Sequence, residues 1–464
     1  MDNEINKIYS EYFDLIDSFF GGIKHHLGSE ENSHIDLGTK MASYPLISDL
    51  ILDAIDGLDE EINKFWEKNK DRVFDSIKSA DSLKCLYSGD ITPSLIGGFV
   101  KRSSLYIDTV ILPDPLFNLS VLQNQLVADK KYYLDKLIRH VFNIWKLKDL
   151  ILADTENKIV AILPINLYFV GKTQRNELLE EADEKFTDYI NNVFGQNLSG
   201  KQDCTDFLNR YDAPTDIFKE IKNPNILPNG FKNINGFTKF LLRFNGTEKY
   251  MKIDNKPHTQ GWGLSLYINS QFIRVQEHKF FCEQLSAEPI YDYDLAWFWF
   301  NYEIGGLDMD ASIANALQKE SFDWIGNSKI PIRAFKKFRE ENRLDYMRSI
   351  LRRGITDLKT KNDTDLVKTA EQLELNLTDA FKQQGSEIDS LKKEISVIFK
   401  KDMPITVGGF LAGFIPGVAN AVSVIMAGRD IKNLFKKRID MKNEIKEKEN
   451  SFINLLMKSH GGEE

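Results

Sequence analysis

Cysteine is scarce in this chain. Its 464 residues include three cysteines, Cys85, Cys204 and Cys282, which lie far apart and form no CxxC pair or other metal-type spacing. Such a set does not support a disulfide framework and is typical of proteins from a reducing compartment. We therefore expect a cytoplasmic protein that needs neither disulfide bonds nor a cysteine-bound metal.

An excess of positive charge is also missing. The formal net charge is −9, with 60 Lys and Arg residues against 69 Asp and Glu residues. Proteins with a general affinity for nucleic acid usually carry a positive excess, so we expect no nucleic-acid partner. The hydrophobic fraction of 42% and the aromatic fraction of 11% are high enough to fill sizeable cores. The composition therefore indicates a globular chain.

Complete catalytic motifs are absent as well. Gly171-Lys172-Thr173 ends like a phosphate-binding loop, but Asn166 stands where that loop needs a glycine to turn around the phosphates. The sequence contains no nucleophile elbow, no dinucleotide-binding glycine pattern and no zinc helix with two histidines. It therefore predicts no cofactor and no metal.

What the first part of the chain does contain is clear periodicity. Apolar residues at helical spacing mark four segments: 2–20, 45–69, 117–128 and 130–152. Three segments rich in β-branched and aromatic residues are typical of strands: 82–91, 103–112 and 157–170. Residues 1–173 are therefore predicted to form a mixed α+β domain.

The rest of the chain favours helices. Residues 174–329 are predicted to be a mainly helical middle region, with loops and one hairpin between 200 and 275, and with the aromatic run 292–302 in its core. From 330 to 464, apolar residues recur at alternating intervals of three and four, as in coiled coils. The predicted fold class is therefore α+β and predominantly α-helical, with a coiled-coil-like long-helix module at the C-terminal end.

The stretch 404–428 contains no charged residue, although charged residues make up 28% of the chain. Its roughly 25 residues are enough for an α-helix to cross a bilayer, but Pro416 and Asn420 interrupt the apolar pattern. Three interpretations stay open: a permanent span, a buried hairpin of two short arms, and a conditional insert that is released on activation. The apolar residues on which they depend are Phe410, Leu411, Phe414, Ile415, Pro416, Val422 and Ile425.

Basic residues flank this stretch on both sides. They are Lys400 and Lys401 before it, and Arg429, Lys432, Lys436, Lys437 and Arg438 after it. Each basic residue near an anionic headgroup layer contributes about 1 kcal/mol to membrane attachment. A solvated helix face is the alternative, because three glutamates follow. We expect a membrane or a protein as partner, the latter including a second copy of the chain bound through the C-terminal helices. The first case places the protein at the periphery of the inner membrane.

Two carboxylates lie near the end of one predicted strand, in the segment YIDTVILPDP. Asp108 and Asp114 are the candidates for a catalytic or cation-binding site, because strand ends often carry such acids. The alternative for Asp114 is an ordinary turn or N-cap residue before the next helix.

Three segments carry a resemblance to known proteins: LYIDTVILPDPL, IPIRAFKKFREENRLDYMRSILRR and FLAGFIPG. They resemble uncharacterised bacterial proteins associated with anti-phage defence and stress response. The resemblance implies a cytoplasmic protein with a sensing or interaction part and a helical effector part, and it implies no catalytic residue. Our leading prediction is a bacterial, non-enzymatic accessory or effector protein. The alternatives are a metal-dependent hydrolase or nuclease that uses Asp108 and Asp114, and a structural, partner-binding subunit.

Overall fold

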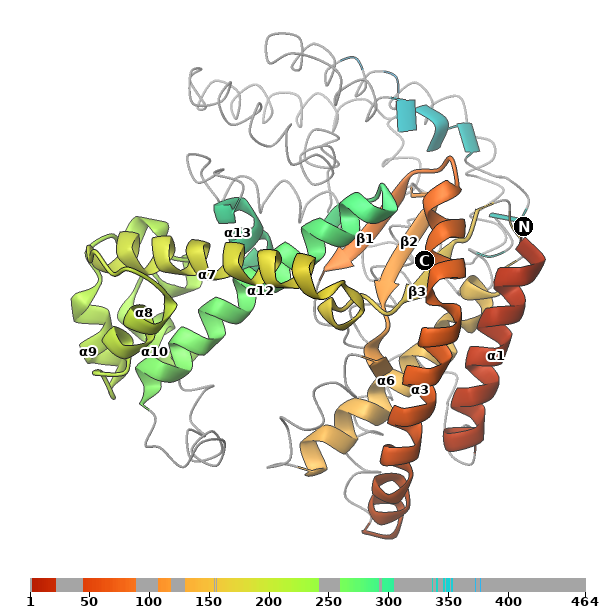
Figure 1. Cartoon of the computed structure of the whole chain (residues 1–464), viewed down its shortest axis with the longest axis horizontal. Coiled ribbons are helices and arrows are strands. Elements are labelled where there is room, and N and C mark those ends of the chain that lie inside the picture. Colours follow the sequence, from red (N-terminus) through yellow and green to blue (C-terminus); the bar gives the residue numbers. More distant parts are fainter. Residues whose placement is uncertain are drawn as a thin grey trace, which may run out of the picture. The chain divides into compact units, whose positions relative to one another are not determined.

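A computed structural model describes most of the first two thirds of the chain. The described residues are 2–21, 45–88, 107–117, 130–153, 155, 157–241, 259–291 and 294–303, with isolated positions between 336 and 376. The chain divides into two compact units (Figure 1). Unit 1 comprises Met1–Ile165, Phe281–Asp292 and Ala314–Glu464, and unit 2 comprises Asn166–Phe280 and Tyr293–Ile313.

Unit 1 is built on a four-stranded parallel sheet of order β3-β2-β1-β4. The strands are β1 (Lys84–Ser88), β2 (Thr109–Pro113), β3 (Val160–Leu163) and β4 (Glu288–Tyr291). Cys85 pairs with Val110 on one side and with Glu288 on the other. The runs TVILP and VAIL are buried along almost their whole length. Such continuous apolar runs are typical of strands that are covered on both faces.

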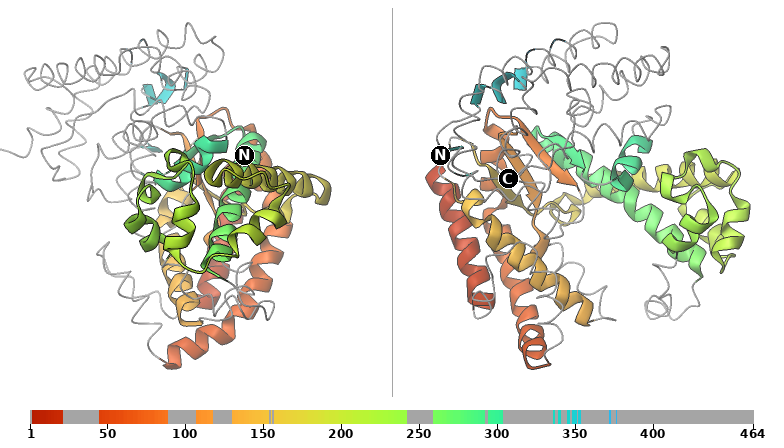
Figure 2. Two further views of the ribbon diagram at one scale, coloured as in Figure 1. Left: turned by 90° about the vertical axis from the view of Figure 1, so that its left-hand side faces the viewer. Right: turned by 180° about the vertical axis from the view of Figure 1, so that it is seen from behind.

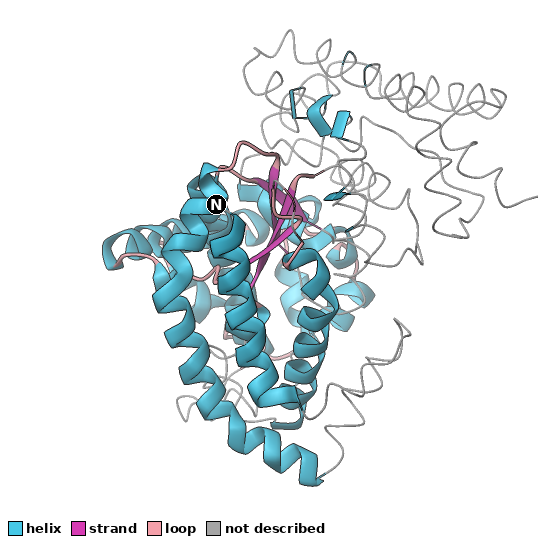
Figure 3. Ribbon diagram, turned by 90° about the vertical axis from the view of Figure 1, so that its right-hand side faces the viewer, coloured by secondary structure: helices cyan, strands magenta, loops and turns pink. Residues whose placement is uncertain are grey.

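Three long helices pack together beside this sheet: α1 (Asp2–Phe20), α3 (Pro45–Ser79) and α6 (Lys130–Ile151). Figures 2 and 3 show them side by side, and both α3 and α6 contact β3. The buried side chains of α1 include Ile5, Ile8, Tyr12 and Ile16, which are three or four residues apart. This spacing gives α1 one continuous apolar face.

Tyr9 of α1 closes the outer edge of β3. Its hydroxyl donates to the carbonyl oxygen of Ile162 at 2.9 Å and accepts from the Ile162 main-chain nitrogen at 3.0 Å. A strand at the end of a sheet leaves such groups unpaired, and buried main-chain groups need partners. One fully buried side chain therefore satisfies both groups of Ile162 and joins the first helix to the sheet.

Unit 2 is helical in the residues that the structure describes. Its longer helices are α7 (Lys172–Phe194), α12 (Gln260–Leu285, of which the last turn belongs to unit 1) and α13 (Asp294–Glu303). Shorter elements complete it: η2 (Leu167–Phe169), α8 (Lys201–Leu208), α9 (Pro214–Glu220), η3 (Pro224–Ile226), η4 (Asn229–Phe231) and α10 (Ile234–Leu241).

At two positions in unit 2, the backbone conformation or a close approach between helices explains why the residue is glycine. Gly195 ends α7 in the left-handed conformation, with φ of 63°, where a side chain would be strained. At Gly261, a β-carbon would lie 1.9 Å from the Leu208 carbonyl oxygen, so only glycine allows α12 to begin this close to α8.

The helix-dominated α+β class is confirmed. The predicted helices 2–20 and 130–152 match α1 and α6, whereas α3 continues ten residues beyond the predicted end at 69. All three predicted strands exist but are shorter. The predicted hairpin does not occur in the described residues between 200 and 275, where the apolar runs FTKFL and GLSLYI belong to α10 and α12. Strand β4 was not predicted, and the long-helix module lies largely outside the described residues.

Candidate functional site: an arginine clasp on Asp108

Asp108 lies immediately before β2, at the amino-terminal edge of the sheet. Its main-chain nitrogen donates to the Leu83 carbonyl oxygen at 3.0 Å, and the Leu83 nitrogen donates to Oδ2 of Asp108 at 2.8 Å. The carboxylate therefore joins the beginnings of β1 and β2. Its side chain is 3% exposed.

Three arginines from one later segment surround this residue. Arg352 donates to Oδ2 of Asp108 from Nη2 at 2.6 Å and from Nε at 3.2 Å. Arg348 places Nε 3.3 Å from Oδ1. Arg339 donates to the carbonyl oxygens of Ile107 and Asp108 at 2.9 and 2.7 Å. We call Asp108, Arg339, Arg348 and Arg352 the arginine clasp.

The local sequence explains why two of these arginines converge. Residues four apart on an α-helix lie on the same face, and the positions around 348–353 that the structure describes are helical. Arg348 and Arg352 can therefore reach the same carboxylate. Sequence reasoning treated the basic residues of 332–353 as the polar side of an apolar stripe and missed the clasp. The four-residue spacing was the available signal, but it does not identify the acid that the arginines contact.

The clasp holds three positively charged side chains in a largely buried environment. Arg339 is 6% and Arg348 is 3% exposed, whereas the side chain of Arg352 is 32% exposed. Burial lowers the pKa of Arg339 to about 9, with the charge of Arg348 adding to that effect and the charges of Asp108 and Asp345 opposing it. Burial also lowers the pKa of Arg348. The three guanidinium groups repel one another, so their arrangement depends on the carboxylate that they surround.

Asp345 supplies a second, weaker carboxylate to this group. Its Oδ1 lies 3.3 Å from Nη2 of Arg348, and its side chain is 64% exposed. An ion pair that faces water contributes little to stability. Asp108 is therefore the principal counter-charge among the residues that these contacts join.

Asp114 lies at the other end of β2 and has different surroundings. Its carboxylate accepts from the Tyr12 hydroxyl at 2.7 Å, from Nε1 of Trp66 at 2.6 Å and from the Leu116 nitrogen at 2.9 Å. The side chain is fully buried. Burial raises the pKa of Asp114, and the hydrogen bonds from Trp66, Tyr12 and the main chain oppose that rise. Asp114 thus holds α1, α3 and the turn after β2 together, and its bond to Leu116 is that of a turn residue.

The structure does not bring the two candidate acids together. The five residues of β2 separate them, which corresponds to about 20 Å along a strand. Within the described ranges, no three His, Cys, Asp or Glu side chains gather as they would around a metal ion. Each acid instead takes part in its own set of contacts with donors from distant parts of unit 1.

The apolar stretch 404–428 and its basic flank, from Lys400 to Arg438, lie outside the described residues. In the part of the chain that is described, no helix is both long enough and apolar enough to cross a bilayer. Whether the stretch inserts is therefore a prediction from sequence.

No family model, curated protein or solved structure matches this chain. The resemblance to defence-associated proteins therefore stays a prediction.

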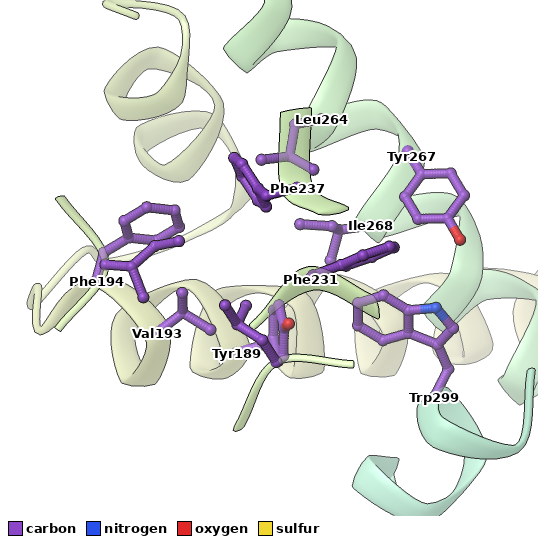
Figure 4. Close-up of a pocket in the computed structure, with 11 residues that line it drawn as sticks. Tyr189, Val193, Phe194, Phe231, Phe237, Leu264, Tyr267, Ile268 and Trp299 are labelled. Carbon is purple, nitrogen blue, oxygen red and sulfur yellow. The ribbon is translucent and has the colours of Figure 1, made fainter. Parts of the chain in front are cut away.

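Unit 2 offers one further place to consider, an apolar cavity between α7, α10, α12 and α13 (Figure 4). Aromatic side chains, among them Tyr189, Phe231 and Trp299, line it. Its volume of about 20 Å³ holds about one water molecule. We interpret it as a packing gap in an aromatic core. The predicted core position of the aromatic run is confirmed for Phe298, Trp299 and Phe300, which are at most 4% exposed.

Two carboxylates in the described part of unit 2 bond to groups on other elements: Glu303 at the end of α13, which is buried, and Glu277 on α12, which is half-buried. Glu303 accepts from Nε2 of Gln276 at 2.9 Å and pairs with Lys279 at 3.1 Å, which joins α13 to α12. Glu277 accepts from the Leu167 nitrogen at 2.8 Å. Burial raises the pKa of Glu277 to about 7. These contacts stabilise the helical packing and do not form an open site.

Proposed function

We propose that this protein is a non-enzymatic accessory or effector protein whose C-terminal long-helix module acts on a membrane or forms an assembly. The observation that supports this function best is the arginine clasp. Asp108, an acid with the sequence context of a catalytic residue, is covered by arginines from the first part of the predicted module. The amino-terminal edge of the sheet thus holds Arg339, Arg348 and Arg352, which belong to the first part of the predicted module.

The surroundings of Asp108 and Asp114 also support a non-enzymatic role. A general acid, a general base or a metal ligand has to reach the substrate, its water or the ion. Asp108 is 3% exposed with contacts to both carboxylate oxygens, and Asp114 is fully buried with three donors. In this conformation neither carboxylate can contact a substrate.

The sequence of 404–428 supports the effector role. Its glycines would allow close helix approach in either protein or lipid. The basic flank would add attraction to anionic headgroups, about 1 kcal/mol for each residue near the surface. A stretch of this kind can be shielded in one state and inserted, or used for self-assembly, in another. Its placement in anti-phage defence follows from the resemblance of the three segments given above.

Vesicle binding and leakage of the full-length protein test this function. Vesicles of phosphatidylethanolamine and phosphatidylglycerol would be mixed with the wild type and with Leu411→Asp, Ile415→Asp and Val422→Asp. We expect the wild type to bind and release dye, and each variant to lose at least tenfold, because a charge in the bilayer core costs about 2.5–3.5 kcal/mol. Leu266→Asp is the matched control, since Leu266 is already 39% exposed on α12.

Self-association is measured on the same samples, because the module can act through assembly. Sedimentation would show whether the wild type forms oligomers that the three apolar variants lose. The function proposed here is wrong if the wild type neither binds vesicles nor self-associates at pH 5 and at pH 8. It is also wrong if the three variants behave like Leu266→Asp in both assays.

A further inference from the structure

We propose that the arginine clasp is a lock that opens, and that its opening releases Arg339, Arg348 and Arg352 from the edge of the sheet at Asp108. This inference rests on the proposed function only for what the module then does. The lock itself rests on the contacts between Asp108 and the three arginines.

The closed state depends mainly on one negative charge. Arg348 and Arg352 both contact the carboxylate of Asp108, and Arg339 is bonded to the main chain on either side of it. If a neutral amide replaces the carboxylate, three guanidinium groups stay close to one another in a largely buried place. Like charges in such a place strongly favour separation. The clasp is therefore expected to open as a unit.

The clasp also has a side from which opening can begin. The side chain of Arg352 is 32% exposed, whereas those of Arg348 and Asp108 are 3% exposed. Asp345, which is 64% exposed, stays close to Arg348 on the solvent side and can keep that guanidinium paired when it leaves Asp108. On opening, Arg348 thus exchanges the buried carboxylate of Asp108 for the exposed carboxylate of Asp345. Its positive charge keeps a negative partner.

The strands explain why opening need not unfold unit 1. Asp108 keeps its main-chain bond to Leu83, and β2 keeps its pairing with β1 and β3, without any contribution from the arginines. Arg339 donates to two main-chain oxygens at this edge, those of Ile107 and Asp108. When Arg339 leaves, these two carbonyl oxygens can accept hydrogen bonds from water instead.

Hydrogen exchange of the full-length protein, read by mass spectrometry, tests the lock. Compared with the wild type, Asp108→Asn is expected to raise the exchange rate of peptides covering 336–353 at least tenfold. Arg352→Gln is expected to raise it less, and Arg352→Lys, which keeps the charge but not the paired donors, should lie between Arg352→Gln and the wild type. Arg353→Gln is the matched control, since Arg353 is an exposed neighbour.

The outcomes separate the lock from the proposed function. If Asp108→Asn exchanges faster throughout both units, it has unfolded, and Arg352→Gln then decides alone. The lock is overturned if peptides covering 336–353 exchange in Arg352→Gln as they do in Arg353→Gln. If exchange responds as expected, but neither the wild type nor the clasp variants bind vesicles or self-associate, the lock stands and the proposed function fails.

Discussion

Asp108 and Asp114 show how strongly the surroundings decide what a carboxylate does. They lie at the two ends of one strand, yet Asp108 is contacted by guanidinium groups and Asp114 by the neutral donors of Tyr12 and Trp66. The sequence predicted both acids near the carboxyl end of one strand, 103–112, whereas Asp108 precedes β2 and Asp114 follows it. The strand begins later than its apolar pattern suggested, and that pattern could not distinguish the two acids. The partners that distinguish them lie 48 to 244 residues away along the chain.

Substitution of Asp114 by asparagine tests its role in joining the helices to the sheet. An amide offers one acceptor atom instead of two, so either Trp66 or Tyr12 and Leu116 would face an N–H donor. We expect the free energy of unfolding to fall by about 2–4 kcal/mol, the cost of breaking a buried polar group's contacts. Urea denaturation measures it. Asp71→Asn, at an 81% exposed side chain, should change stability by less than about 0.5 kcal/mol.

Substitution of Glu277 by glutamine tests the stability–pH relation of unit 2. The pKa of Glu277 is raised from 4.5 to about 7, so the folded state binds its proton more tightly than the unfolded state does. The stabilisation is complete below about pH 4.5 and is lost as the pH rises through about 7. Glutamine keeps an acceptor for the Leu167 nitrogen and carries no charge.

We therefore expect Glu277→Gln to be more stable than the wild type at pH 8, by about 1–2 kcal/mol, and equal to it near pH 4.5. Thermal unfolding across this range measures the difference. Glu283→Gln, on the exposed side of the same helix, is the control and should show no such trend. A difference that is the same at all pH values would contradict the assignment.

At the scale of elements, sequence predicted those that depend on local pattern. The helices α1 and α6 are given by apolar spacing alone, and their ends fall within one residue of the prediction. Strand β4 was missed because EPIY is short, lacks alternation and contains a proline. Its strand conformation depends on pairing with β1, some 200 residues earlier in the chain. The short apolar runs of α10 and α12 were ambiguous between helix and strand for the same local reason.

The edge contact of Tyr9 is a second element-level feature that sequence could not show. Tyr9→Phe removes one hydroxyl and leaves both main-chain groups of Ile162 unpaired at the edge of β3. We expect a loss of about 2–3 kcal/mol in the free energy of unfolding. Tyr168→Phe is the control, because Tyr168 is 55% exposed. Equal stability of the two variants would show that α1 does not depend on this hydroxyl.

At the level of the whole molecule, the clasp brings together residues that are far apart in the sequence. Arg352 and Asp108 are separated by 244 residues. Apolar periodicity predicted a helical C-terminal module but contained no information on what its first segment contacts. The clasp contributes that contact. It connects the sheet of unit 1 to the first part of the predicted C-terminal module.

A double-mutant cycle between Asp108 and Arg352 measures whether Asp108 holds the C-terminal segment at the sheet. The free energy of unfolding would be measured for the wild type, Asp108→Asn, Arg352→Gln and the double variant, with Arg353→Gln replacing Arg352→Gln in a control cycle. We predict a coupling energy of about 1–3 kcal/mol for the first cycle and less than about 0.5 kcal/mol for the control. Equal, near-zero coupling in both cycles would show that Asp108 does not hold the C-terminal segment.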